Sequence, residues 1–271
     1  MNLTRRKFLR HAFRATASGL LVPAVLAAGP VVTRRVVLAG APAPPAPPAG
    51  YTVYASAFDG TNDYMARGAA LTGCVDGRKG IVSVWCKIIG GNGVLQRLFF
   101  NLNSYCHVWK GSDNKFNVTM QGQFGVTIAS IESASTYLAG TGWLHLFSTW
   151  DASAGLRKLY INGVSDLGTD SGNNADIYYN QDNWFFGADS SGADKINMEV
   201  CEVYLNTVEY LDDPTKFASG GKPISLDADG SLPTGTAPII YLKNPYDTFG
   251  TNSGTGGNFT VTGALTQGTP P

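Results

Sequence analysis

The sequence is poor in the residues that most often carry catalysis, hold metals or bind phosphate. Only 15% of its 271 residues are charged, and it has three histidines and four cysteines. The cysteines form no CxxC pair, and the chain has neither a G-x-S-x-G motif nor a Gly-Lys-Ser/Thr phosphate loop. These absences exclude the commonest zinc, serine-hydrolase and nucleotide-binding classes.

Acidic residues are missing from the first 50 positions, although the whole chain has a formal net charge of zero. Residues 51–271 consequently hold 13 basic and 20 acidic side chains, a net charge of −7. Nucleic-acid binding needs clustered lysine and arginine, so an acidic body argues against that class of partner. The basic residues of the first 50 positions are Arg5, Arg6, Lys7, Arg10, Arg14, Arg34 and Arg35.

Residues 1–29 have the features of a leader, with a basic start followed by a mildly apolar run over 15–28. The sequence "RRKFL" near its start resembles the twin-arginine export motif, which a receptor recognises. The run is too short and too polar for a membrane-spanning helix. The alternative is a basic anchoring arm that stays on the chain, and the pair Arg34–Arg35 beyond the expected cleavage point favours it. The sequence leaves both alternatives open.

Residues 30–50 form a Pro/Ala-rich linker. Five prolines between positions 41 and 50 favour extended polyproline II structure and exclude a helix. We therefore expect a semi-rigid spacer between the leader and a body that comprises residues 51–271.

The body shows the periodicity of short β-strands. Segment 81–88 places Val82, Val84, Cys86 and Ile88 on one face. Helical periodicity is scarce, although 212–219 predicts one short helix with Pro214 near its start. Further strand-like segments, separated by Gly, Asn, Asp and Ser at intervals of about ten residues, are 115–120, 143–151, 157–163 and 196–206. The sequence therefore predicts an all-β sandwich or barrel.

Four segments carry a family resemblance in their order along the chain. They are "AFDGTNDYMARG", "GIVSVWCKI", "GWLHLFSTWDASAGLRKLYINGV" and "NWFFGADSSGADKINMEVCEVYLN", within residues 57–206. Together they resemble the laminin-G-like or concanavalin-A-like jelly roll of the lectin/glucanase superfamily. The resemblance implies two antiparallel sheets packed face to face, with the first and last strands side by side. We therefore expect 258–267 to pair with 55–59, and the tail after residue 220 resembles an extension found in members encoded by tailed phages and prophages.

The residues that catalysis would need are absent or unsuitably placed. Enzymes of the resembled family carry carboxylates on alternate residues of a strand, whereas Glu199 and Glu202 are three residues apart. On a regular strand that spacing points them to opposite faces. His145 matches a position that is usually a packing residue in the family, and adjacent Cys106 and His107 point apart on a strand. The sequence predicts a protein that is not an enzyme.

Binding residues are the more promising class. Flat aromatic rings suit carbohydrate, and Tyr178 and Tyr179 are the best pair because strand neighbours face opposite ways. No cofactor is expected, although loop aspartates at the rim of such a sandwich permit a calcium ion; ordinary turn chemistry is the alternative for them. The carbohydrate candidates are Tyr105, Trp109, Tyr178, Tyr179 and Trp184, and the metal candidates are Asp59, Asp63, Asp189 and Asp194.

The cysteine count is even, which permits up to two disulfides if the protein leaves the cytosol. Buried free thiols are the alternative, since cysteine is often a small core residue. The four cysteines are Cys74, Cys86, Cys106 and Cys201.

These observations lead to two hypotheses about function. In the first, the chain is a non-enzymatic virion protein of a tailed bacteriophage, a capsid-decorating or fibre-like jelly roll that binds host surface glycans. Residues 1–50 would anchor it to other virion proteins of the capsid or neck, and cover of its edge strands would favour a homo-oligomer. In the second, the chain is a lectin-like bacterial protein exported by the twin-arginine route to the periplasm or the exterior.

Overall fold

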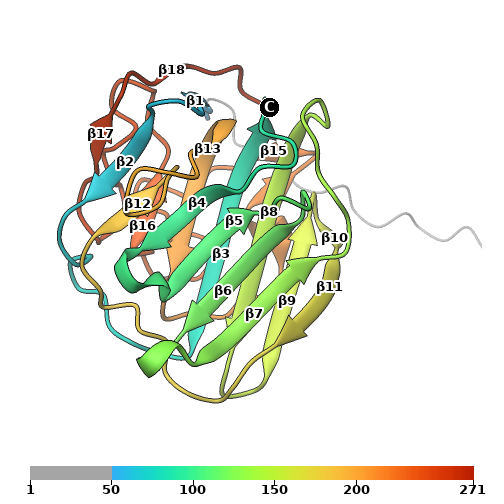
Figure 1. Ribbon diagram of the computed structural model, residues 1–271, viewed down its shortest axis with the longest axis vertical. Helices are drawn as coiled ribbons and strands as arrows, with labels where there is room; N and C mark the ends of the chain where they lie inside the picture. Colours follow the sequence, from blue (N-terminus) through green and yellow to red (C-terminus); the bar gives the residue numbers. More distant parts are fainter. Residues whose placement is uncertain (1–50) are drawn as a thin grey trace, which may run out of the picture. The chain divides into compact units, whose positions relative to one another are not determined.

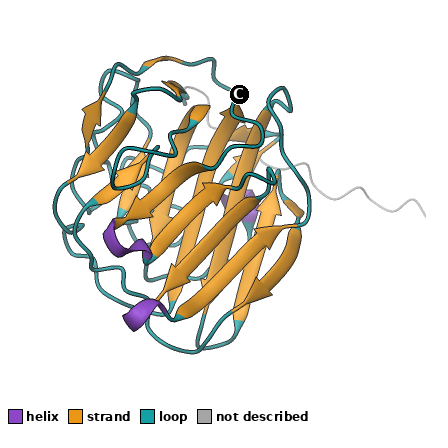
Figure 2. Ribbon diagram, viewed as in Figure 1, coloured by secondary structure: helices purple, strands orange, loops and turns teal. Residues whose placement is uncertain are grey.

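The computed structural model describes residues 51–271, so the predictions for the leader and for the Pro/Ala-rich linker lie outside the described residues. The described chain is built from two large antiparallel sheets, as the sequence predicts, with three single-turn 3-10 helices between strands (Figures 1 and 2). No helix within residues 51–271 has the length and apolar character needed to cross a membrane.

Sheet A has the strand order β10-β9-β8-β3-β13-β1-β18, and β16 also pairs with β13. Its three long central strands coincide with three of the segments that the sequence predicts to be strands. The alternating apolar residues of these strands supply one face of the core. Its strands are β1 (Ser56–Asp59), β3 (Lys79–Ile88), β8 (Trp143–Asp151), β9 (Leu156–Ile161), β10 (Val164–Ser165), β13 (Asn197–Asn206), β16 (Ile240–Leu242) and β18 (Thr266–Gln267).

Sheet B has the strand order β11-β7-β6-β5-β4-β12-β2-β17. Its strands are β2 (Tyr64–Arg67), β4 (Gln96–Asn101), β5 (Cys106–Lys110), β6 (Phe116–Gln121), β7 (Thr127–Ser133), β11 (Leu167–Ser171), β12 (Trp184–Phe186) and β17 (Thr260–Thr262). A separate small hairpin joins β14 (Ala218–Ser219) to β15 (Lys222–Pro223), and the 3-10 turns are η1 (Leu102–Ser104), η2 (Gln123–Gly125) and η3 (Pro214–Lys216). The η3 turn is the short helix expected near Pro214, and the Asp213 carboxylate caps it by accepting from the Thr215 N–H.

The main hydrophobic core lies between the two sheets. It contains Val82, Val84, Cys86 and Ile88, the four residues that the alternation of 81–88 places on one face. The C-terminal strand β18 pairs with β1 through Ser56 and Gln267, so the expected neighbourhood of first and last strands is present. Strand β17, from the same C-terminal segment, instead pairs with β2 in sheet B. The segment 258–267 therefore contributes to both sheets.

The outer face of sheet A, turned away from the shared core, is also covered. Ile81, Phe147 and Tyr204 project from that face and pack against Phe217 and Leu226 of the segment 207–239. This second hydrophobic cluster explains why β3, β8 and β13 are buried on both faces. In sheet B, strands β5, β6 and β7 lie side by side at the front of Figure 1.

Candidate functional site

The structure divides the five aromatic candidates into two groups. Tyr179 and Trp184 are fully buried, and the Tyr179 hydroxyl accepts from Trp150 Nε1 and donates to the Lys79 carbonyl. These two residues are core, so their prediction as carbohydrate-binding residues is wrong. Tyr178 is half-buried whereas Tyr179 is buried, although the two residues lie outside any strand, directly after the isolated bridge residue Ile177.

Tyr105 and Tyr178 come together at one end of sheet B. Their ring centroids are 5.4 Å apart, and the Tyr105 carbonyl and the Tyr178 N–H both bond to the backbone of Gln121. Trp109 lies elsewhere, half-buried on β5, on the outer face of sheet B. The structure therefore separates the three remaining aromatic candidates into a rim pair and a face residue.

Trp109 belongs to a row of aromatic and polar side chains that crosses the outer face of sheet B. Its ring lies 5.5 Å from that of His107, and its strand partners are Arg97 on β4 and Asn117 on β6. The row continues through cross-strand pairing, because Phe100 pairs with both His107 and Phe185, and Asn117 pairs with Glu132. We call this row the polar–aromatic strip; it consists of Phe185, Phe100, Arg97, His107, Trp109, Asn117 and Glu132.

Arg97 fixes the centre of the strip. Its Nε donates to Asp194 Oδ2 at 3.0 Å, and its Nη1 lies 3.1 Å from His107 Nδ1. Its guanidinium also lies over the Phe100 ring, 4.8 Å from the centroid, within the range of a cation–π contact. At the far end, Lys115 Nζ donates to Glu132 Oε1 at 2.7 Å. The strip thus presents aromatic rings beside polar groups that their own hydrogen bonds and ion pairs hold in position.

Residues 59–208, more than half of the chain, match a laminin-G-type family model described as the concanavalin A-like lectin/glucanases superfamily. The chain belongs to this superfamily. No curated protein sequence matches it.

Solved structures with the same fold are distant in sequence. A Bacteroides ovatus protein, provisionally named as a carbohydrate binding protein, is 12% identical with a TM-score of 0.58; the match covers 81% of this chain and 61% of that one. A heptameric SAP-like pentraxin from Limulus polyphemus is 12% identical with a TM-score of 0.48, covering 80% and 95%. Mouse laminin alpha1 domains LG4-5 are 11% identical with a TM-score of 0.39, covering 63% and 47%. At these identities the likeness establishes the fold alone.

The four candidate calcium ligands of this superfamily member are used in local structure. Asp59 and Asp189 accept backbone N–H groups of their own turns, those of Thr61 and Ser191 among them. Buried Asp63 accepts from the Ala264 N–H, and Asp194 pairs with Arg97. Within residues 51–271 no three His, Cys, Asp or Glu side chains are arranged to hold a metal. Asp59 and Asp189 thus follow the alternative of turn chemistry, whereas Asp63 and Asp194 also bond to residues far away in the sequence.

The two glutamates of β13 depart from the geometry expected for them. A β-bulge between Cys201 and Tyr204 puts Glu202 at a φ of 48° and shifts the strand's alternation by one residue. Glu199 pairs with Lys87 at 3.2 Å, whereas Glu202 Oε2 accepts from the Tyr241 hydroxyl at 2.7 Å. Both partners belong to the outer side of sheet A, so the prediction of opposite faces is wrong. Each carboxylate nevertheless has a structural partner of its own.

The cysteines are all buried and free, so the disulfides considered from the sequence are not formed in the described chain. Cys86 and Cys201 lie on neighbouring strands, but Cys86 faces the main core and Cys201 faces the outer side of sheet A. Burial raises the pKa of Cys86 to about 12 and that of Cys74 to about 11, which keeps both as thiols. Cys106 is likewise in the core, and its neighbour His107 is on the outer face, as strand alternation predicts.

Proposed function

We propose that the chain is a non-enzymatic, lectin-like carbohydrate-binding protein that binds glycans on the polar–aromatic strip. The observation that carries the proposal is Trp109, a half-buried indole on an accessible sheet face, flanked by polar groups that Arg97 holds in place. Apolar C–H faces of a sugar pack on an aromatic ring, while its hydroxyls need a few convergent polar partners. The superfamily is described by its lectins and glucanases, both of which bind carbohydrate, and this membership supports the carbohydrate-binding part of the proposal, as does the name of the Bacteroides ovatus protein.

The strip is long enough for several sugar units. It crosses five neighbouring strands, β12, β4, β5, β6 and β7, and at about 4.8 Å between strands this corresponds to roughly 20 Å. We therefore expect an oligosaccharide to bind more tightly than the corresponding monosaccharide. On a multivalent particle even weak affinity for each copy would be useful.

Replacing Trp109 with alanine tests the site. A glycan array probed with the full chain identifies a bound oligosaccharide, and titration then measures its affinity. We expect Trp109→Ala to weaken binding by about tenfold or more, because the indole supplies the stacking surface. Trp143→Ala is the matched control, since this half-buried tryptophan lies on the outer side of sheet A. Equal affinities for the two variants, or an array with no bound glycan, would contradict the proposal.

We further propose that the protein sits on the surface of a tailed-phage virion and that residues 1–50 anchor it to the particle. Two features support this: the phage-like C-terminal extension, and seven basic residues without one acidic residue in the first 50 positions. Retention of the leader separates this role from twin-arginine export. The intact mass of the protein from its native source is expected to correspond to a chain that starts at Met1 or Asn2. A mass starting near Gly29 would instead show cleavage and export.

A further inference from the structure

The polar–aromatic strip contains two charged side chains, Arg97 on β4 and Glu132 on β7. Each is paired with a residue of opposite charge that lies outside the strip. Arg97 Nε lies 3.0 Å from Asp194 Oδ2, and Lys115 Nζ lies 2.7 Å from Glu132 Oε1. The charges of the strip and of its two ion-pair partners therefore sum to zero.

The pair at Arg97 is held at more than one point. The Arg97 backbone N–H donates to the Asp194 carbonyl at 2.9 Å, so the main chains are joined as well as the side chains. The two side chains are only 18% and 29% exposed, which limits the screening of their attraction by salt. A ligand carboxylate that approached the guanidinium would therefore come close to the carboxylate of Asp194, and like charges at short distance repel.

The strip side chains on the two strands between these pairs, β5 and β6, add no positive charge. Arg97 Nη1 lies 3.1 Å from His107 Nδ1. Because a guanidinium only donates, His107 Nδ1 must accept, and an imidazole with one accepting nitrogen is uncharged. Trp109 and Asn117 are neutral by nature. The part of the strip that offers stacking and hydrogen bonds thus lacks a cation for an acidic ligand.

The surrounding body of the protein is also unfavourable for anions. Residues 51–271 hold 13 basic and 20 acidic side chains. The resulting negative field opposes the approach of an anionic ligand, and the opposition weakens as salt screens it. Short-range pairing and long-range field therefore act in the same direction.

We propose that the polar–aromatic strip selects uncharged oligosaccharides and rejects those that carry carboxylates. The inference rests on the proposed glycan-binding function and adds the class of glycan. A neutral sugar stacks on Trp109 and exchanges hydrogen bonds with His107 and Asn117 through its hydroxyls. A uronic or sialic acid would lose part of the hydration of its carboxylate without gaining an unpaired cation.

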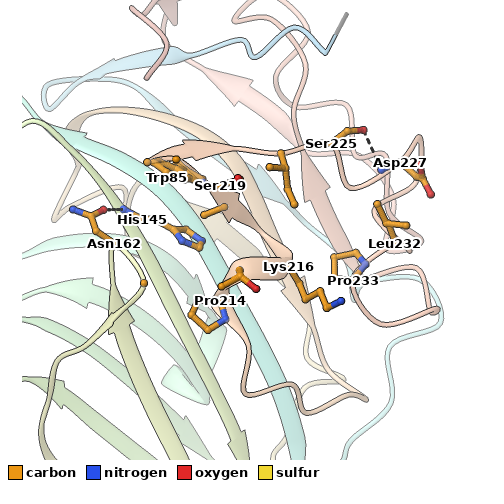
Figure 3. Close-up of a pocket in the computed structure, with 16 residues that line it drawn as sticks. Trp85, His145, Asn162, Pro214, Lys216, Ser219, Ser225, Asp227, Leu232 and Pro233 are labelled. Carbon is orange, nitrogen blue, oxygen red and sulfur yellow. Dashed lines mark hydrogen bonds between the residues drawn. The ribbon is translucent and has the colours of Figure 1, made fainter. Parts of the chain in front are cut away.

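A second place for a ligand lies on the other sheet. A cavity of about 700 Å³ is lined by Trp85 and His145 of sheet A and by residues of the segment 214–233 (Figure 3). Its lining is mainly apolar, but it includes the exposed side chain of Lys216. Because this cavity and the strip belong to different sheets, a substitution on the strip shows which of the two a bound sugar occupies.

The test uses the full chain and matched pairs of oligosaccharides. The acidic members are a hyaluronan tetrasaccharide, tetragalacturonate and a sialylated lacto-N-tetraose. Each neutral member is the same sugar with its carboxyl groups reduced to alcohols. In every pair that the chain binds, the neutral member is expected to bind about tenfold more tightly in calorimetric titration. Trp109→Ala should weaken that binding by about tenfold, which places it on the strip.

Releasing one cation should reverse the selection. Asp194→Asn keeps an oxygen that accepts from Arg97 Nε but removes the negative charge. Asparagine also tolerates the left-handed φ of 52° at this position. The variant should bind the acidic members about tenfold more tightly than the wild type does and the neutral members within about twofold. Glu132→Gln, which releases Lys115, should act in the same direction.

Glu199→Gln is the matched control, because it changes the net charge by the same amount but releases Lys87 on sheet A. It should leave the affinities for both members of each pair close to the wild-type values. The inference is overturned if an acidic member binds as tightly as its neutral partner and Trp109→Ala removes that binding. It is also overturned if Asp194→Asn and Glu199→Gln change the acidic affinity equally.

These results are distinct from a failure of the proposed function. In both overturning cases the strip still binds glycans, so the lectin function stands while the selection for neutral sugars falls. Acidic binding that Trp109→Ala leaves unchanged lies away from the strip and agrees with the inference. If no member of any pair binds, the lectin function itself is contradicted, and the inference that rests on it falls as well.

Discussion

Replacing Trp150 with alanine is expected to lower the free energy of unfolding by about 4 kcal/mol, the usual cost of deleting a fully buried tryptophan side chain. Trp150 lies on β8 with its indole in the main core, and its Nε1 donates to the Tyr179 hydroxyl at 2.8 Å. The substitution removes apolar contacts, leaves a cavity and takes away one partner of Tyr179. Urea unfolding of the full chain, followed by circular dichroism, measures the change.

The site of Trp150 has little freedom to collapse around such a cavity. Gly80 lies opposite on β3, and a Cβ atom there would come within 2.3 Å of the Trp150 ring and 2.7 Å of the Tyr179 hydroxyl. Glycine at this position therefore makes room for two large rings rather than for an unusual backbone angle. Because the surrounding elements are strands of two packed sheets, we expect the cavity to remain largely open.

Trp143→Ala is the matched control for this prediction. Trp143 begins the same strand, but it is half-buried on the outer side of sheet A, where its Nε1 donates to the Thr269 carbonyl. Its removal should cost about 1 kcal/mol, since less surface returns to water. Equal losses for the two variants would contradict the assignment of Trp150 to the main core.

Strand alternation predicted much of the fold because most strands are regular. It placed Val82, Val84, Cys86 and Ile88 in the core. Tyr178 and Tyr179 do differ in burial, but they lie outside any strand, next to the isolated bridge residue Ile177. Alternation alone does not say which of two neighbours faces inward. The buried member is the one whose hydroxyl completes a hydrogen bond to Trp150, a contact that depends on a strand 29 residues away.

The bulge at Glu202 shows where the same reasoning fails. One extra residue in β13 turns the side chains that follow it to the face opposite to the one that regular alternation predicts. Nothing in "MEVCEV" marks this insertion, because the residue with the left-handed backbone conformation is a glutamate rather than a glycine. The cavity between the outer face of sheet A and residues 214–233 was also beyond sequence reasoning. Its lining residues Trp85 and His145 are separated from that segment by roughly 70 to 150 residues, so no local motif spans it.

Glu202 itself gives the second large expected effect, a change in the pH dependence of stability. Burial raises its pKa from 4.5 to about 7, with Tyr51, the Tyr241 hydroxyl and Lys243 opposing the shift only in part. The folded state therefore binds a proton more tightly than the unfolded chain does. The resulting stabilisation is complete below pH 4.5 and is lost as the pH rises to about 7. The total loss is about 3 kcal/mol.

His145 conceals this effect in the wild-type protein. Burial depresses its pKa from 6.5 to about 3, so its contribution is complete above pH 6.5 and is lost as the pH falls. Between pH 4.5 and 6.5 the two groups therefore have opposite slopes, and the wild-type stability should change little with pH over that interval.

Glu202→Gln separates the two contributions. Glutamine still accepts from Tyr241 but never charges, so the variant should match the wild type near pH 4.5 and exceed it by about 3 kcal/mol above pH 7. Groups that titrate elsewhere cancel in this difference, since they are the same in both proteins. The free energy of unfolding of the variant, unlike that of the wild type, should rise as the pH rises to 6.5, because His145 then no longer binds a proton in the unfolded chain. A difference between Glu202→Gln and wild type that does not vary with pH would show that the pKa of Glu202 is the same in the folded and unfolded states, and would contradict the prediction.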